Sequence, residues 1–179
     1  MKKLFLMLCV ALVSVGAFAQ KGEQRVGLNL NYGTEIANVG LGAKYQYGLT
    51  DAIRLEGGFD YFFKKDGASM WDININAHYL FPFADKFAAY PLVGLTYTNW
   101  GLDYAVGYDM DSNSSTGNMW GMDEEIASGK VHESRFGVNL GAGIQYDITD
   151  NWAANFEIKY QLIGDFGQAV FGIGAAYKF

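Results

Sequence analysis

Apolar and polar residues alternate with a period of two along most of the chain, which is typical of β-strands whose two faces meet different surroundings. The run WDININAHY at residues 71–79, for example, places large apolar residues on one face and Asp, Asn and His on the other. The alternation predicts eight strands, most of them close to the 9–11 residues with which a tilted strand crosses a membrane. They are expected at residues 26–32, 39–47, 53–63, 71–79, 93–98, 135–146, 152–162 and 171–179.

The predicted connections are alternately long and short. Short polar turns are expected at residues 50–52, 82–86 and 149–151, and longer loops at residues 33–38, 64–69, 100–133 and 164–168. This asymmetry is typical of up-and-down outer-membrane barrels, in which the short turns face the periplasm and the longer loops face outside. The expected fold class is therefore all-β, an eight-stranded antiparallel up-and-down transmembrane β-barrel in one domain.

Volume decides which face of each strand points outward. The interior of an eight-stranded barrel is just wide enough for side chains to fill it, and the many Phe, Tyr, Trp, Ile and Leu residues of the apolar face would not fit. A soluble barrel with an apolar interior is thereby excluded. Charged residues within the predicted strands all lie on the small, polar face, as expected where an Arg or Lys facing the bilayer midplane costs about 2–4 kcal/mol.

The N-terminal segment has the features of a cleavable signal peptide. Lys2 and Lys3 precede an apolar run at residues 4–15, and Ala17-Phe18-Ala19 is a small-x-small cleavage pattern. We expect a signal peptide at residues 1–19 and the barrel domain at residues 20–179. Cleavage would remove the only cysteine, Cys9, and would change the formal charge from −6 to −8. The mature chain would then have no thiol for a disulfide or metal site, and no basic patch for nucleic acid.

The C-terminal strand carries the most specific motif of the chain. Its outward face ends in aromatic residues, with Phe171, Ile173, Tyr177 and the final Phe179 on one side. With the segment Tyr90-Pro91-Leu92-Val93-Gly94, this pattern resembles the small OmpA/OmpX-type outer-membrane barrels, including those of Bacteroidetes type, from Arg25 to Phe179. The resemblance implies a bacterial outer-membrane protein with extracellular loops and periplasmic termini. It also implies contact with lipid and lipopolysaccharide, and insertion by the outer-membrane assembly machinery, which would read the aromatic C-terminus.

Charged residues on the inward face form the first candidate site. Asp60, Asp72 and Arg135 are expected toward the outer end, and Lys44, Glu56, Glu157 and Lys159 near the middle. We expect a lumen network of ion pairs and hydrogen bonds that plugs the barrel; the alternative is a gated polar path for water or ions. Its predicted members are Lys44, Arg54, Glu56, Asp60, Asp72, Arg135, Glu157 and Lys159.

The longest predicted loop is both acidic and rich in aromatic residues, a combination that suits a contact surface for a protein or ligand. The alternatives are a solvated acidic loop, or aromatic residues that pack over the barrel mouth. Asp109-x-Asp111-x-Asn113 resembles the start of a calcium loop, but Ser114 and Trp120 replace the required Gly and Glu, so no metal is expected. The predicted surface comprises Asp103, Tyr104, Tyr108, Asp109, Asp111, Trp120, Asp123, Glu124 and Glu125.

Catalysis finds little support in the sequence. His132, Glu133 and Ser134 are adjacent, but in a strand Glu133 would point away from the other two, which is a poor geometry for a triad. We therefore expect a non-enzymatic, monomeric surface barrel without a cofactor, acting in envelope structure, adhesion or binding of an extracellular partner. The alternative function is a narrow porin-like channel for water or small solutes.

Overall fold

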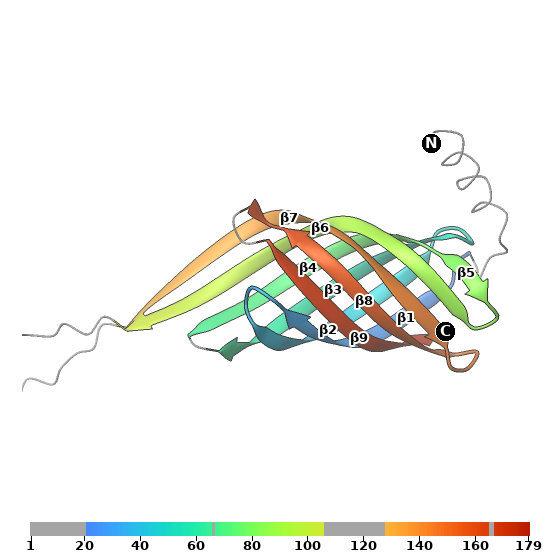
Figure 1. The fold of residues 1–179 in the computed structure, drawn as a ribbon, viewed down its shortest axis with the longest axis horizontal. Helices are drawn as coiled ribbons and strands as arrows, with labels where there is room; N and C mark the ends of the chain where they lie inside the picture. Colours follow the sequence, from blue (N-terminus) through green and yellow to red (C-terminus); the bar gives the residue numbers. More distant parts are fainter. Residues whose placement is uncertain (1–20, 66, 106–127, 165–166) are drawn as a thin grey trace, which may run out of the picture.

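The computed structural model describes residues 21–65, 67–105, 128–164 and 167–179. Nine antiparallel strands form one sheet, and eight of them close into a barrel because β4 pairs with β6 and β1 pairs with β9 (Figure 1). The strands are β1 (Gln24–Gly33), β2 (Asn38–Gly48), β3 (Ile53–Lys65), β4 (Ala68–Tyr79), β5 (Phe81–Ala84), β6 (Phe87–Ala105), β7 (Ser128–Asp147), β8 (Trp152–Leu162) and β9 (Gln168–Lys178). In this described part, no helix is long and apolar enough to cross a membrane.

The predicted barrel is confirmed, and each of the eight predicted strands coincides with one of β1–β4 or β6–β9. Three predicted connections were wrong in extent. Residues 82–86 are largely strand, since β5 pairs with the start of β6 as a hairpin. Residues 64–69 mostly continue β3 and β4, with Lys65 opposite Ala68. The predicted loop 100–133 begins and ends as strand, because β6 continues to Ala105 and β7 begins at Ser128.

The last of these errors has a physical cause. A strand alternates apolar and polar residues only where its two faces meet different surroundings. The ladder between β6 and β7 continues through Trp100–Glu133 to Ala105–Ser128, beyond the last large outward residue of β7, Phe136. There the hydrogen-bond ladder persists although the apolar contrast has ended, so periodicity does not reveal it.

Large apolar side chains cover the outside of the barrel, and small or polar ones fill the inside. Leu28 is 69% exposed, Leu95 63% and Phe136 81%, whereas Asp72 and Asn139 are fully buried. Inward glycines make this filling possible. A Cβ on Gly42 would lie 2.0 Å from Asp60 Oδ1, so the carboxylate occupies space that any other residue would take.

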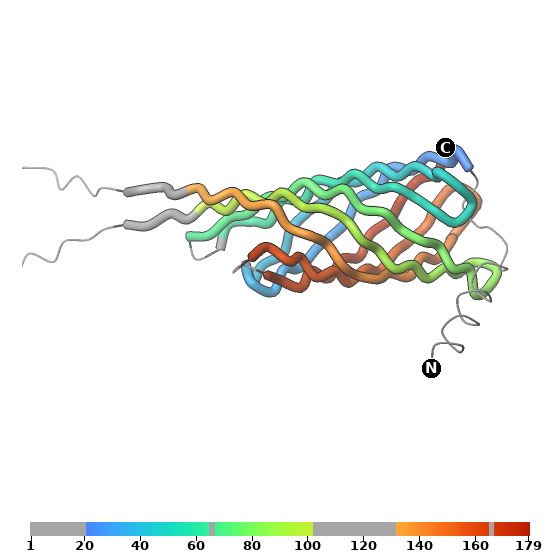
Figure 2. Tube along the Cα trace, turned by 90° about the horizontal axis from the view of Figure 1, so that it is seen from above, coloured from blue at the N-terminus to red at the C-terminus, as the bar shows by residue number. Residues whose placement is uncertain are grey.

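The two ends of the barrel differ. Phe179, the short turns and the β5–β6 hairpin lie at one end, called here the terminus end, and the long β6–β7 hairpin projects from the other, the loop end (Figures 1 and 2). The seam between β1 and β9 is continuous from Arg25–Lys178 to Gly33–Val170. At the terminus end, Phe179 N donates to Gln24 O over 3.1 Å, so the first and last strands close the barrel like any other neighbours.

Candidate functional site: the lumen and the projecting hairpin

Glu56 lies at the centre of the polar groups in the terminus half of the lumen. Gln46 Nε2 donates to its Oε2 over 2.6 Å and Asn76 Nδ2 to its Oε1 over 3.2 Å. Lys44 Nζ lies 3.4 Å from the same carboxylate, and both side chains are at most 5% exposed. A buried carboxylate with two hydrogen bonds and an ion pair is well compensated for the water it has lost.

Arg54 connects this group to the other side of the lumen. Its Nη1 donates to Gln145 Oε1 over 2.7 Å, and its Nη2 lies 3.3 Å from His78 Nδ1. The imidazole of His78 stacks on the ring of Tyr90 with 4.7 Å between centroids, and Tyr90 OH donates to Glu157 Oε2 over 3.1 Å. Five strands, β3, β4, β6, β7 and β8, thus meet across the barrel axis at this level.

A second polar group, centred on Asp60, lies nearer the loop end. Lys159 Nζ is 3.2 Å from Asp60 Oδ2, and Asn31 Nδ2 and Asn74 Nδ2 donate to the two carboxylate oxygens over 2.7 and 3.0 Å. Asp72 accepts from Gln161 Nε2 over 3.0 Å. Gln168 Nε2 in turn donates to Gln161 Oε1 over 2.8 Å, which extends the polar groups to the start of β9.

Apolar side chains close the lumen beyond these polar groups. At the loop end a cluster, called here the apolar cap, consists of Ile36, Phe62, Met70, Trp100 and Val170. Phe62 has no exposed surface and Met70 is 1% exposed. A second apolar cluster consists of Leu80, Tyr90 and Leu92. It lies beside the Glu56 group, since Leu92 stands opposite His78 in the sheet. The apolar cap thus closes the polar section at the loop end.

The structure brings most of the predicted lumen residues together. Lys44 pairs with Glu56 and Asp60 with Lys159, while Arg54, Asp72 and Glu157 reach neutral side chains. Arg135 pairs with Glu133, and the two side chains are 34% and 45% exposed.

Sequence reasoning missed two kinds of lumen residue. The neutral partners Gln46, Asn74, Tyr90 and Gln161 have contacts as short as those of the charged residues, and their inward positions were the available signal. The apolar cap gave no signal, because Phe62 and Met70 occupy positions on the polar face.

Three buried residues have the composition of a metal site. Ligand atoms of Glu56, His78 and Glu157 lie within 4.8 Å of one another. The surroundings do not fit a cation. Because Arg54 can only donate, His78 Nδ1 must accept and the neutral imidazole carries its hydrogen on Nε2, the nitrogen that faces Glu56. The ammonium of Lys44 already neutralises that carboxylate. The group is better described as a hydrogen-bonded cluster than as a metal centre.

The predicted loop surface is placed only in part. Asp103 and Tyr104 belong to β6, opposite Lys130 and Gly129 of β7, whereas Tyr108, Asp109, Asp111, Trp120, Asp123, Glu124 and Glu125 lie outside the described residues. Near the base of this hairpin, Ser134 Oγ accepts from Asn99 Nδ2 over 2.6 Å. The hydroxyl of Ser134 is therefore engaged with β6.

One edge of the projecting hairpin is open. β6 pairs with β7 as far as Ser128, and β4 covers the other edge of β6 as far as Leu102. β8 ends at Leu162, opposite Val138. Over the described residues, positions 128–137 of β7 thus have a neighbouring strand on one side only. Such an edge presents N–H and C=O groups that another chain could pair with.

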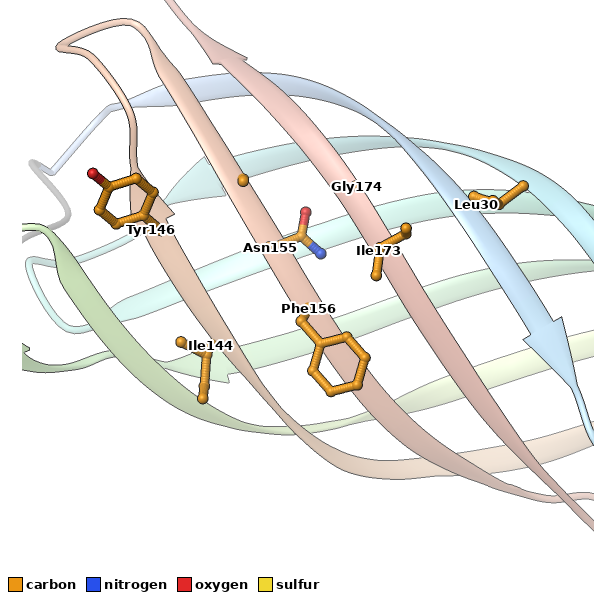
Figure 3. Close-up of a pocket in the computed structure, with 8 residues that line it drawn as sticks. Leu30, Ile144, Tyr146, Asn155, Phe156, Ile173 and Gly174 are labelled. Atoms are coloured by element: carbon orange, nitrogen blue, oxygen red, sulfur yellow. The ribbon is translucent and has the colours of Figure 1, made fainter.

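The predicted assembly residues lie on the outer wall of the closing strand β9 and at its end. Phe171, Ile173 and Tyr177 are 39–56% exposed, and Phe179 is 63% exposed. Ile173 also borders a hollow of about 690 Å³ on this wall, shown in Figure 3, which Leu30, Ile144 and Phe156 line as well. Ala154 leaves this space between larger neighbours. Because the hollow is mostly apolar and lies on the outer wall, lipid chains would fill it.

Comparisons with known proteins agree with this architecture. The family model described as "Outer membrane protein beta-barrel domain" matches residues 5–179. No curated protein matches the chain.

Several solved structures share the fold. The N-terminal β-barrel domain of Pseudomonas aeruginosa OprF is 18% identical with a TM-score of 0.66, covering 92% of this chain and 99% of that chain. Neisserial surface protein A is 12% identical with a TM-score of 0.65, covering 89% and 98%. The attachment invasion locus protein Ail of Yersinia pestis, in complex with the heparin analogue sucrose octasulfate, is 18% identical with a TM-score of 0.58, covering 89% and 100%.

Proposed function

We propose that this chain, which belongs to the outer membrane protein beta-barrel domain family, is a closed membrane anchor that presents the β6–β7 hairpin to an extracellular partner. The hairpin and the loops would face outward, and the termini would face the periplasm. The barrel would act as a non-enzymatic, monomeric scaffold. The open edge of β7 is the observation that carries it.

An extended segment of a partner protein would fit this edge. In β-strand addition, main-chain hydrogen bonds supply affinity and alternate side chains supply specificity. The edge offers ten residues, positions 128–137, that β8 does not reach. The adjoining segment is acidic, and the chain has a formal charge of −6. A polypeptide strand therefore fits this chain better than a sulfated polyanion such as the one in the Ail complex.

Proline substitutions at Val131 and His132 test whether the edge is free. N–H groups of a strand point alternately to its two sides, so only one of these two residues donates to β6. We expect one variant to lose stability, because it removes a ladder bond, and the other to fold like the wild type, because proline is tolerated where the N–H faces solvent. Urea unfolding in lipid vesicles would measure both. Equal destabilisation of both variants would show that the edge is already paired.

The variant that retains stability then tests binding. With the protein displayed on a bacterial surface, adherence to wells coated with fibronectin, laminin or collagen would be compared with that of the wild type. We expect the edge proline to reduce adherence, because it interrupts an added strand. A matched proline outside the edge, at the exposed turn residue Asp51, should leave adherence unchanged. Adherence that is insensitive to the edge proline would contradict the proposal.

A narrow channel is the second candidate, because polar side chains line the lumen between the apolar cap and the terminus end. Single-channel recording in planar bilayers distinguishes the two functions. We expect no current steps from wild-type protein whose folding is verified by circular dichroism. The reason is that Phe62 and Met70, which are 0% and 1% exposed, fill the lumen at the loop end. Discrete, reproducible steps would favour the channel.

A further inference from the structure

The terminus half of the lumen holds an excess of buried hydrogen-bond donors. Nη1 and Nη2 of Arg25, Nε of Arg54, Nζ of Lys44 and Nε2 of His78 are buried and make no hydrogen bond to any described residue. All four side chains belong to residues that are at most 4% exposed. The corresponding atoms nearer the loop end include the acceptors Asn139 Oδ1 and Gln168 Oε1, so the excess of donors is local.

Three of these donors belong to the guanidinium groups of Arg25 and Arg54. Arg25 pairs with Glu23 only through Nε, which leaves both terminal nitrogens directed into the lumen. Arg54 makes its hydrogen bonds to the neutral residues Gln145 and His78 and forms no ion pair with a described carboxylate. Glu56 and Glu157 lie in the same half of the lumen but form no ion pair with Arg54. A buried cation without a close counter-charge is costly, by several kcal/mol in proteins, so an additional acceptor would stabilise these groups.

The two guanidinium groups lie on the same side of the lumen. Arg25 is opposite Gln46 on β2, and Gln46 is opposite Glu56 on β3, two residues from Arg54. Gly48 stands opposite Arg54 and adds no side chain between them. Lys44 and His78 are already directed at a carboxylate, since their donors lie 3.4 and 3.7 Å from Glu56. The donors that remain without an acceptor are therefore those of the two guanidinium groups.

We propose that this part of the lumen binds one small anion, of about the size of chloride, between Arg25 and Arg54. The lumen is tightly packed beside Arg25, because a Cβ on Gly27, two residues along β1, would lie only 3.0–3.2 Å from Ala175 O, Ala176 Cβ and Lys44 Cγ. A monatomic anion therefore suits this part of the lumen better than a bulky oxoanion. The anion accepts from the two guanidinium groups and removes their mutual repulsion. It thereby completes the polar plug independently of what the hairpin binds.

Bromide in place of chloride tests the site directly. Crystals of the refolded wild-type protein soaked in sodium bromide should show one anomalous peak within hydrogen-bond distance of both guanidinium groups. Arg25→Gln and Arg54→Gln should lack the peak. Lys178→Gln should keep it, because Lys178 lies at the same end but faces Asp147. The absence of a peak in the wild-type lumen, or a peak elsewhere, would show that water satisfies these donors and would overturn the proposal.

Thermal unfolding gives a second readout that does not depend on crystals. Replacing gluconate by chloride at constant ionic strength should raise the unfolding midpoint of the wild type and of Lys178→Gln saturably. At a chloride concentration of ten times the Kd, the ratio of folded to unfolded protein rises about tenfold. In Arg54→Gln the difference between the two salts should vanish, whatever its absolute stability. A wild-type midpoint that is equal in both salts would also overturn the proposal.

Discussion

Replacing Lys159 with methionine is expected to lower the free energy of unfolding by about 3–5 kcal/mol, as removal of one partner from a buried ion pair does. Lys159 Nζ lies 3.2 Å from Asp60 Oδ2, and the two side chains are 7% and 6% exposed. Asp72 shares Asn74 as a donor with Asp60. The substitution would leave two neighbouring carboxylates without a cation. Urea unfolding of protein refolded in lipid vesicles measures the loss.

The double variant Asp60→Asn with Lys159→Met separates the charge effect from the loss of packing. Because it removes both charges, we expect it to recover at least half of the stability lost in Lys159→Met. Lys178→Met is the control at a longer and less buried ion pair. Lys178 lies 3.8 Å from Asp147 and is 14% exposed. This substitution should cost no more than about 1 kcal/mol. A loss for Lys159→Met that is no larger than this control would mean that water compensates Asp60.

Replacing Phe62 with alanine is expected to cost about 3–5 kcal/mol, the usual range for truncating a buried Phe. Phe62 lies at the centre of the apolar cap and has no exposed surface. Its neighbour Phe63 points outward and is 41% exposed. Phe63→Ala is thus a matched control whose side chain contacts lipid rather than the lumen. We expect Phe63→Ala to cost clearly less in the same urea experiment.

Truncation of the cap should also change permeability. Phe62→Ala combined with Met70→Ala removes the two most buried side chains of the cap and leaves Gln168 and Gln161 as the next lumen residues. We expect this double variant to give small current steps in planar bilayers where the wild type is silent. A silent double variant that is still folded would place the barrier in the polar groups around Asp60.

The strands and their faces follow from local sequence, because lipid on one side and the lumen on the other impose a period-two contrast on most strands. The contrast ends where β6 and β7 extend beyond the large apolar residues of the outer wall, so the extension of these strands to Ala105 and Ser128 could not be predicted. Contacts inside the lumen could not be predicted either. Asp60 and Lys159 meet from strands that are not neighbours, and their meeting depends on the tilt and stagger of the whole barrel.

The apolar cap illustrates a second limit. Phe62 and Met70 interrupt a polar face, and alternation alone cannot distinguish an inward apolar residue from an irregularity in the pattern. The register resolves it, because Phe62 on β3 stands directly opposite Met70 on β4, which stands opposite Trp100 on β6. Three of the five cap residues thus form one row of the sheet, and only the pairing of three strands makes that row visible.

The seam between β1 and β9 has a further consequence. Its ladder runs from Arg25–Lys178 to Gly33–Val170 without interruption, and Phe179 N reaches Gln24 O over 3.1 Å. In the closed barrel, β9 and β1 are therefore paired like two strands that a turn connects. A circular permutant with a short linker from Phe179 to Lys21 and new ends in the turn at 149–151 would present the same lumen and the same outer wall. It would begin with β8 and end with β7, so the order in which strands are made could be changed without changing the barrel.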